Sequence, residues 1–252
     1  PGLSNAPCSS CGAPPPSRPA INHDARAPGP TQTSTLIREA IHVETAQSIY
    51  GLAMLLERGL LYSAPLAPGL WRQISLVLSD ENVQRISAIY GPEQPPRVHL
   101  LAGVISLLGL PLGVGQENNP TCQSARALSM WAYNDPDYLM HLIAQAARYD
   151  NIQMHFEGIT IDSAGLPPGL VGDVPLDTDP VSMILVPHLD RVYGEMGRLC
   201  SDRDEDPHRW INPEFHGWWV GRDFVIAVDI ATGALSDYDT FLRRFYCSFH
   251  PL

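Results

Sequence analysis

The chain has 252 residues, of which 44% are hydrophobic, and a formal net charge of −11. This apolar fraction excludes a mostly disordered polymer, and the strong negative charge argues against nucleic-acid binding through a basic surface. The longest apolar stretch, residues 100–114, is too short for a membrane span and is interrupted by Pro111.

The first 31 residues carry eight of the 24 prolines. Such a composition buries too little apolar surface to offset the entropy of ordering the chain. We therefore predict a flexible leader over residues 1–31 and a single α+β domain over residues 32–252. The leader has no apolar signal-peptide core, so we expect no Sec signal.

Helical spacing of apolar residues dominates the first half of the domain. Residues 35–59 predict one long helix that ends at Gly59. Ser79, followed by two acidic residues, predicts an N-cap for a helix that ends at Gly91. Further helices are predicted over 98–110, 121–133, 135–149, 180–199 (with a kink at Pro187) and 236–246.

Strand patterns follow these helices. Residues 152–161 alternate in hydrophobicity and predict a strand, with a shift at Gly158 that suggests a bulge. Residues 215–220 and 224–230 predict two strands joined by a tight turn. Helices followed by strands indicate an α+β fold in which a helical N-terminal half packs on an antiparallel sheet.

Among the five cysteines, whose irregular spacing is not that of a disulfide framework, Cys122 has the most reactive predicted environment. It follows the predicted N-cap Thr121, where free backbone N–H groups and the helix dipole favour a thiolate. Cys200 and Cys247 lie near predicted helix C-termini, where the dipole opposes ionisation, and the other two lie in the leader. A buried structural thiol is the alternative interpretation of Cys122.

A thiol nucleophile needs an imidazole base and a group that orients the imidazole. His216 begins the first strand of the predicted C-terminal hairpin, and Asp229 ends the second. A four-residue loop would place these two side chains on one face, whereas a three-residue loop would send them to opposite faces unless a bulge intervenes. The alternatives are a solvated histidine at a strand end and an aspartate that caps the following turn.

This order of residues resembles the transglutaminase-like branch of the papain-like superfamily. His216, Trp218 and Asp229 match its H-x-W…V-D pattern. The resemblance implies a papain-like/transglutaminase-like fold and a Cys122–His216–Asp229 triad. It also implies that Gln116 helps to stabilise the oxyanion, and Trp218 is a candidate residue of the substrate groove.

Two features depart from the pattern of that superfamily. Gln123 follows Cys122 where an aromatic residue is expected. The long separation between Cys122 and His216 implies an insertion around residues 165–207.

The acidic residues 202–206 lack the spacing of an EF-hand and are interpreted as a solvated loop, so no metal or other cofactor is expected. Because all 16 basic residues are arginine, Schiff-base and P-loop chemistry, which need lysine, are excluded.

Residues 119–132 are similar to the cysteine region of AvrPphE/HopX/XopE-type type III effectors of plant pathogens. The two resemblances together imply a secreted virulence protein that acts on a host protein amide in the host-cell cytoplasm, as a thiol protease, deamidase or transglutaminase. We expect no nucleic-acid or membrane partner and leave any activating host factor open. The alternatives are a non-catalytic module that binds a host protein, or the same triad acting on a nucleotide or glycosidic substrate.

Overall fold

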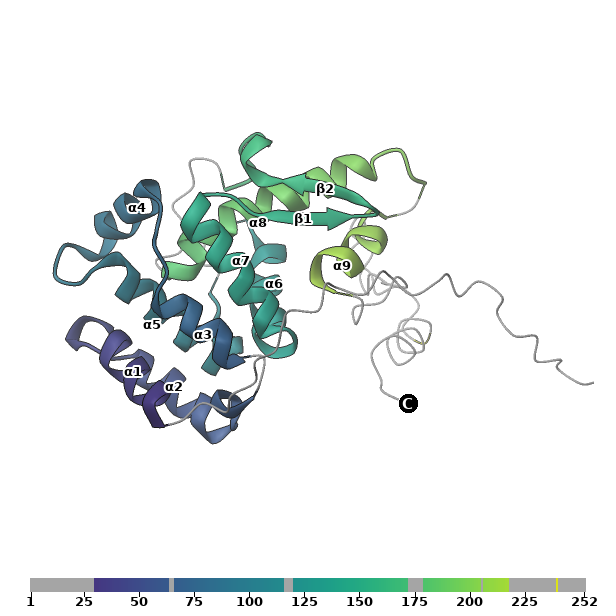
Figure 1. Cartoon of the computed structure of the whole chain (residues 1–252). Helices are drawn as coiled ribbons and strands as arrows, with labels where there is room; N and C mark the ends of the chain where they lie inside the picture. Colours follow the sequence, from purple (N-terminus) through teal and green to yellow (C-terminus); the bar gives the residue numbers. More distant parts are fainter. Residues whose placement is uncertain are drawn as a thin grey trace, which may run out of the picture.

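The computed structural model describes residues 30–63, 66–115, 120–171, 179–204, 206–217 and 239. Helices make up most of this part of the chain, together with a two-stranded antiparallel sheet. The α-helices are α1 (Pro30–Ala40), α2 (Ser48–Glu57), α3 (Leu66–Ile74), α4 (Asp80–Tyr90), α5 (Pro96–Gly109), α6 (Cys122–Asn134), α7 (Pro136–Tyr149), α8 (Pro180–Leu199) and α9 (His208–His216) (Figure 1). Short 3₁₀ turns are η1 (Val43–Thr45), η2 (Leu60–Tyr62), η3 (Pro111–Gly113) and η4 (Ser163–Gly165).

The prediction of one long helix over residues 35–59 is wrong, because this segment forms α1 and α2 with the turn η1 between them. The backbone becomes extended at His42 (φ −128°, ψ 177°). The hydroxyl of Thr45 donates to the carbonyl of Ala40 at 2.6 Å, so a side chain satisfies a carbonyl at the end of α1. After α2, Gly59 adopts a left-handed conformation (φ 66°), which confirms the predicted helix end.

The helices predicted from residue 79 to residue 199 are confirmed, with boundaries shifted by one or two residues. Ser79 caps α4 by accepting a hydrogen bond from the Asn82 backbone N–H at 3.3 Å. Asp135 caps α7 in the same way. Thr121 occupies the N-cap position of α6, although its side chain makes no capping hydrogen bond.

The segment predicted as a bulged strand is a hairpin of β1 (Gln153–Phe156) and β2 (Ile159–Asp162). Glu157 (φ 48°) and Gly158 (φ 85°) form the turn between the two strands. Two consecutive residues with positive φ are typical of the type I′ turn, whose twist matches that of a hairpin. Gly158 therefore marks a chain reversal and not a bulge.

The prediction that His216 begins a strand is also wrong, because this residue ends α9. Ile211 and Phe215 are both buried and stand four residues apart, which is the spacing of one helix face. Gly217 follows with φ 113°, a backbone conformation that favours glycine. The remainder of the predicted C-terminal hairpin and the predicted helix over 236–246 lie outside the described residues.

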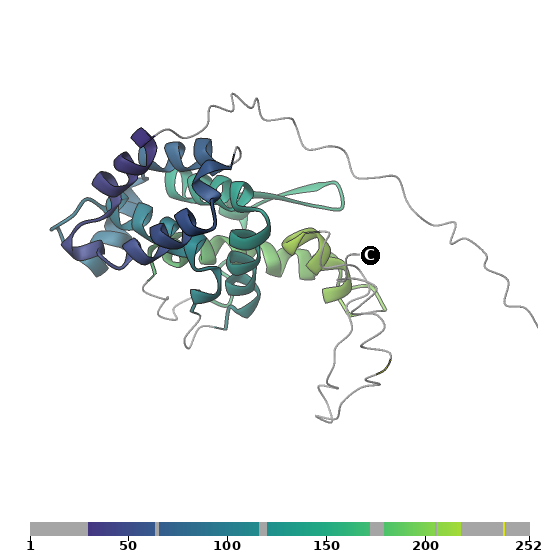
Figure 2. The same cartoon turned by 90° about the horizontal axis from the view of Figure 1, so that it is seen from below.

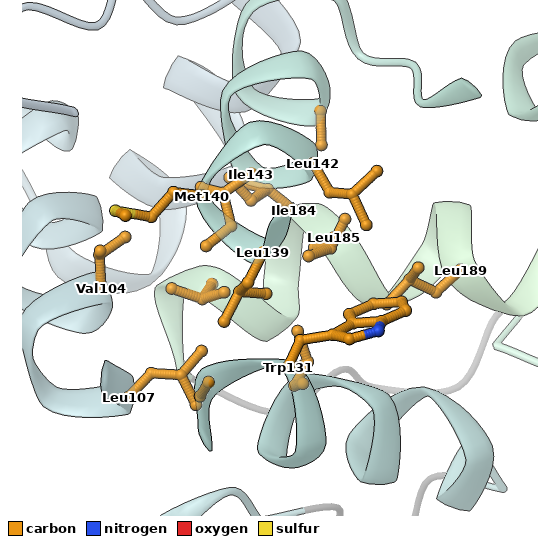
Figure 3. Close-up of a cluster of buried hydrophobic side chains, with 14 of the residues drawn as sticks. Val104, Leu107, Trp131, Leu139, Met140, Leu142, Ile143, Ile184, Leu185 and Leu189 are labelled. Carbon is orange, nitrogen blue, oxygen red and sulfur yellow. The ribbon is translucent and has the colours of Figure 1, made fainter. Parts of the chain in front are cut away.

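Helices α6, α7 and α8 enclose the centre of the hydrophobic core. Figure 3 shows Trp131 of α6 below the facing side chains of α7 and α8. Residues labelled there include Leu139, Met140, Leu142 and Ile143 of α7 and Ile184, Leu185 and Leu189 of α8, all of which are buried. No helix in the described part of the chain is long and apolar enough to cross a membrane.

The helix pair α1–α2 and the β-hairpin lie at opposite ends of the described part (Figures 1 and 2). In the described part of the chain, the hairpin packs on α8 and α9. The architecture, mostly helical with a small antiparallel sheet, agrees with α+β only in this coarse sense. Helices α2 and α5 approach so closely that the backbones of Gly51 and Gly109 are in direct contact.

Candidate functional site

Cys122 is the first residue of α6, as predicted, and its side chain is exposed. The thiol therefore stands where backbone N–H groups without helical partners point outward. Cys200, the other cysteine in the described residues, is buried at the C-terminal end of α8, and burial raises the pKa of its thiol. Of these two thiols, only that of Cys122 is accessible to a substrate.

His216 reaches the start of α6 from the end of α9. Its side chain is fully buried, and Nε2 lies 3.1 Å from Oε1 of Gln123, the residue after Cys122. A carbonyl oxygen can only accept, so Nε2 carries the proton and donates it to Gln123. The lone pair of the neutral ring is then on Nδ1, which has no hydrogen-bond partner among the described residues.

Arg126 connects Cys122 and His216 electrostatically. It stands one helical turn after Cys122, on the same face of α6, and its charge helps to lower the pKa of His216. Tyr193 of α8, whose pKa is raised by burial, interacts electrostatically with both Arg126 and Cys122. We call Cys122, Gln123, Arg126, Tyr193 and His216 the Cys122 corner.

The structure thus brings two of the five predicted site residues, Cys122 and His216, to one corner of the molecule. No hydrogen bond joins the Cys122 thiol to the His216 ring within the described residues. Gln116, Trp218 and Asp229 lie outside the described residues, so their predicted roles stay predictions.

Gln123, the partner of His216, is not among the site residues predicted from the sequence. Its only signal in the sequence is its position after Cys122, where it departs from the pattern of the papain-like superfamily. In the structure Oε1 of Gln123 accepts from Nε2 of His216 and thereby helps to hold the imidazole in place.

No protein-family model, curated protein or solved structure matches the chain. The resemblances to transglutaminase-like enzymes and to type III effectors therefore remain predictions. Within the described ranges, no cluster of three or more histidine, cysteine or acidic side chains has the arrangement of a metal site.

A second cluster has the composition of a catalytic triad but a structural role. The ring of His188 lies between the Ser163 hydroxyl, 3.0 Å from Nδ1, and the Asp150 carboxylate, 3.5 Å from Nε2. Ser163 is fully buried. Its hydroxyl also accepts a hydrogen bond from the Ile152 backbone N–H and donates one to Oδ1 of Asn151. Since a substrate cannot reach this hydroxyl, the cluster holds the base of the hairpin against α8.

Burial, with smaller contributions from Arg126 and His208, lowers the pKa of His216 from its ordinary 6.5 to about 3. The unfolded chain therefore binds a proton below pH 6.5 that the folded protein does not bind until about pH 3. The free energy of unfolding should consequently fall as the pH decreases through this window, by up to about 1.4 kcal/mol per pH unit from this residue.

Urea unfolding of wild type and His216→Gln at pH 7 and pH 5 measures this effect. The variant should lose less stability on acidification than wild type. The substitution His155→Gln, at an exposed position in β1, is the control for replacing a histidine by glutamine elsewhere in the protein. Equal losses in wild type and His216→Gln would contradict the assignment.

Proposed function

We propose that the protein is a cysteine-dependent acyl-transfer enzyme that acts on protein amides, with Cys122 as nucleophile and His216 as base. The observation that carries this proposal is the hydrogen bond between His216 and Gln123, which ties the predicted base to the residue after the predicted nucleophile. A host-protein substrate, delivery into a host cell and a papain-like arrangement of the whole domain belong to the same proposal.

In the proposed reaction, Nδ1 of His216 takes the proton of the Cys122 thiol as the sulfur attacks the substrate carbonyl. The N-terminus of α6 offers backbone N–H donors to the oxyanion of the tetrahedral intermediate. The imidazolium then returns the proton to the leaving amine, and a thioester remains on Cys122. Attack by water gives hydrolysis or deamidation, and attack by an amine gives transamidation.

Gln123 is a positioning residue in this scheme. Its Oε1 accepts the Nε2 proton of His216, so the ring must present its lone pair from Nδ1. Burial holds the pKa of His216 near 3, so the imidazole of the free protein is neutral at pH 7 and its Nδ1 can accept a proton. We expect substrate binding to bring Nδ1 to the sulfur, since catalytic hydrogen bonds often tighten only in the complex.

A non-catalytic module that binds a host protein is the second candidate. It is favoured by the complete burial of His216 and by the lack of a Cys122–His216 hydrogen bond among the described residues. In that case the Cys122 corner would have no catalytic role, and its accessible thiol would react no faster than a free thiol.

Acylation by an activated ester distinguishes these candidates. Wild-type protein and glutathione are mixed with the same ester at pH 7, and the acylated cysteine is mapped by peptide mass spectrometry. An enzyme should acylate at Cys122 about a hundredfold or more faster than the free thiol, and His216→Gln should remove this acceleration. Acylation of Cys122 at the rate of glutathione would reject the catalytic proposal and leave the binding module.

A further inference from the structure

A cavity of about 580 Å³ lies on a different part of the molecule from the Cys122 corner. It is lined by η1 and the start of α2, the end of α4, one face of α5, η3 and the first residues of α8. Its volume is in the range of small-molecule sites, which are commonly a few hundred cubic ångströms. None of the described lining residues belongs to the Cys122 corner.

The charged side chains that line this cavity are acidic. Glu44 belongs to η1 and Asp179 stands at the start of α8, and no arginine is among the described lining residues. Each carboxylate is held in place, since Glu44 accepts from Gln94 at 3.1 Å and Asp179 accepts from the Ser182 backbone at 2.8 Å. Two fixed negative charges favour a cationic occupant.

One wall of the cavity carries a stacked aromatic pair. The rings of Tyr90 and His99 are stacked, with centroids 4.4 Å apart and planes inclined by 21°. His99 is only 3% exposed, and its Nε2 has no hydrogen-bond partner among the described residues. A buried polar atom of this kind is costly unless it is paired, so an occupant that forms a hydrogen bond with Nε2 would stabilise the wall. Aromatic faces also attract cations.

A smaller cavity of about 150 Å³ adjoins this one and shares Ser106, Gly113, Gly115 and Asp179 with it. Its remaining wall is largely apolar. The apolar side chains are those of Leu107, Leu110 and Val114. The combined space therefore offers two carboxylates beside an aliphatic recess.

We propose that this cavity binds a small organic cation, an ammonium or guanidinium group attached to a short aliphatic chain. The cationic group lies between Glu44 and Asp179 and donates toward the His99 wall, and the aliphatic chain enters the recess at Leu107. This site does not depend on the chemistry proposed for Cys122.

Isothermal titration of the full chain with pentylamine, whose single ammonium group ends a short aliphatic chain, tests the proposal. Pentanoate, an anion with a similar chain, is the ligand control. Pentylamine should bind and pentanoate should not. The substitutions Glu44→Gln and Asp179→Asn, which keep the side-chain shape and the α8 cap, should each raise the dissociation constant about tenfold.

Glu195→Gln is the matched protein control, because it removes one charge from the far end of α8, where Glu195 pairs with Arg198. It should leave the affinity unchanged, as should Cys122→Ala. No heat of binding at millimolar pentylamine, equal binding of pentanoate, or an equal loss in Glu195→Gln would each overturn the proposal.

Discussion

Replacing Cys122 by alanine should reduce acyl transfer by about a thousandfold or more while leaving the free energy of unfolding within about 0.5 kcal/mol of wild type. The side chain is exposed, so its removal leaves no cavity in the core. Activity is measured as acyl-enzyme turnover with the activated ester, and stability by urea unfolding. Cys200→Ala removes a buried thiol at the end of α8 and should keep the activity.

The same assay tests whether Gln123 orients the His216 ring or only fills the space beside it. Gln123→Ala leaves Nε2 of His216 without its acceptor and should lower the rate about tenfold to a hundredfold. Gln123→Glu keeps an acceptor oxygen in place and should restore most of the rate, with a pH profile shifted upward because a carboxylate raises the pKa of the adjacent imidazole. Equal activity in all three proteins would show that Gln123 does not position the ring.

Replacing Gly51 by alanine should destabilise the fold by about 3 kcal/mol. A Cβ at this position would lie 2.5 Å from the carbonyl oxygen of Ile105 and 2.6 Å from Cα of Ser106. Both are backbone atoms of α5, so no side chain can move aside, and α2 must shift away from α5. Gly109→Ala should act similarly, since its Cβ would meet the backbone of Gly51.

Gly194→Ala is the matched control for these substitutions. Gly194 is an exposed residue of α8, and a Cβ there would meet no atom within 4 Å. Alanine should therefore stabilise the protein by about 0.5–1 kcal/mol through helix propensity. If urea unfolding gives Gly51→Ala the stability of wild type, the close packing of α2 on α5 is wrong.

Elements whose ends carry a local chemical signal, such as a capping residue, could be predicted from the sequence. Ser79 and Asp135 are caps whose effect is confined to a few residues, and the helices that follow them begin where predicted. The break between α1 and α2 could not be predicted in this way. It depends on the Thr45 hydroxyl satisfying the carbonyl of Ala40, while the apolar spacing continues across it.

The errors at the hairpin and at His216 have a related cause. Short apolar segments fit both a helix and a strand, so tertiary packing decides between them. Phe215 packs in the core as part of a helix face with Ile211, which a two-residue period starting at Phe215 does not describe. The prediction that Cys122 begins a helix is confirmed, because it needs only a local signal for a helix start. The contact of His216 with Gln123 joins segments 93 residues apart, and a local pattern does not reveal it.

Arg203, in the connection between α8 and α9, joins the tip of the β-hairpin to the helix that ends in His216. Its guanidinium pairs with Glu157 in the hairpin turn and lies over the Trp210 ring of α9, 4.8 Å from the ring centre. Because one guanidinium contacts both elements, we expect the hairpin and α9 to open and to exchange their amide protons as one cooperative unit. The burial of the His216 ring at the end of α9 would then depend on the hairpin that α9 packs against.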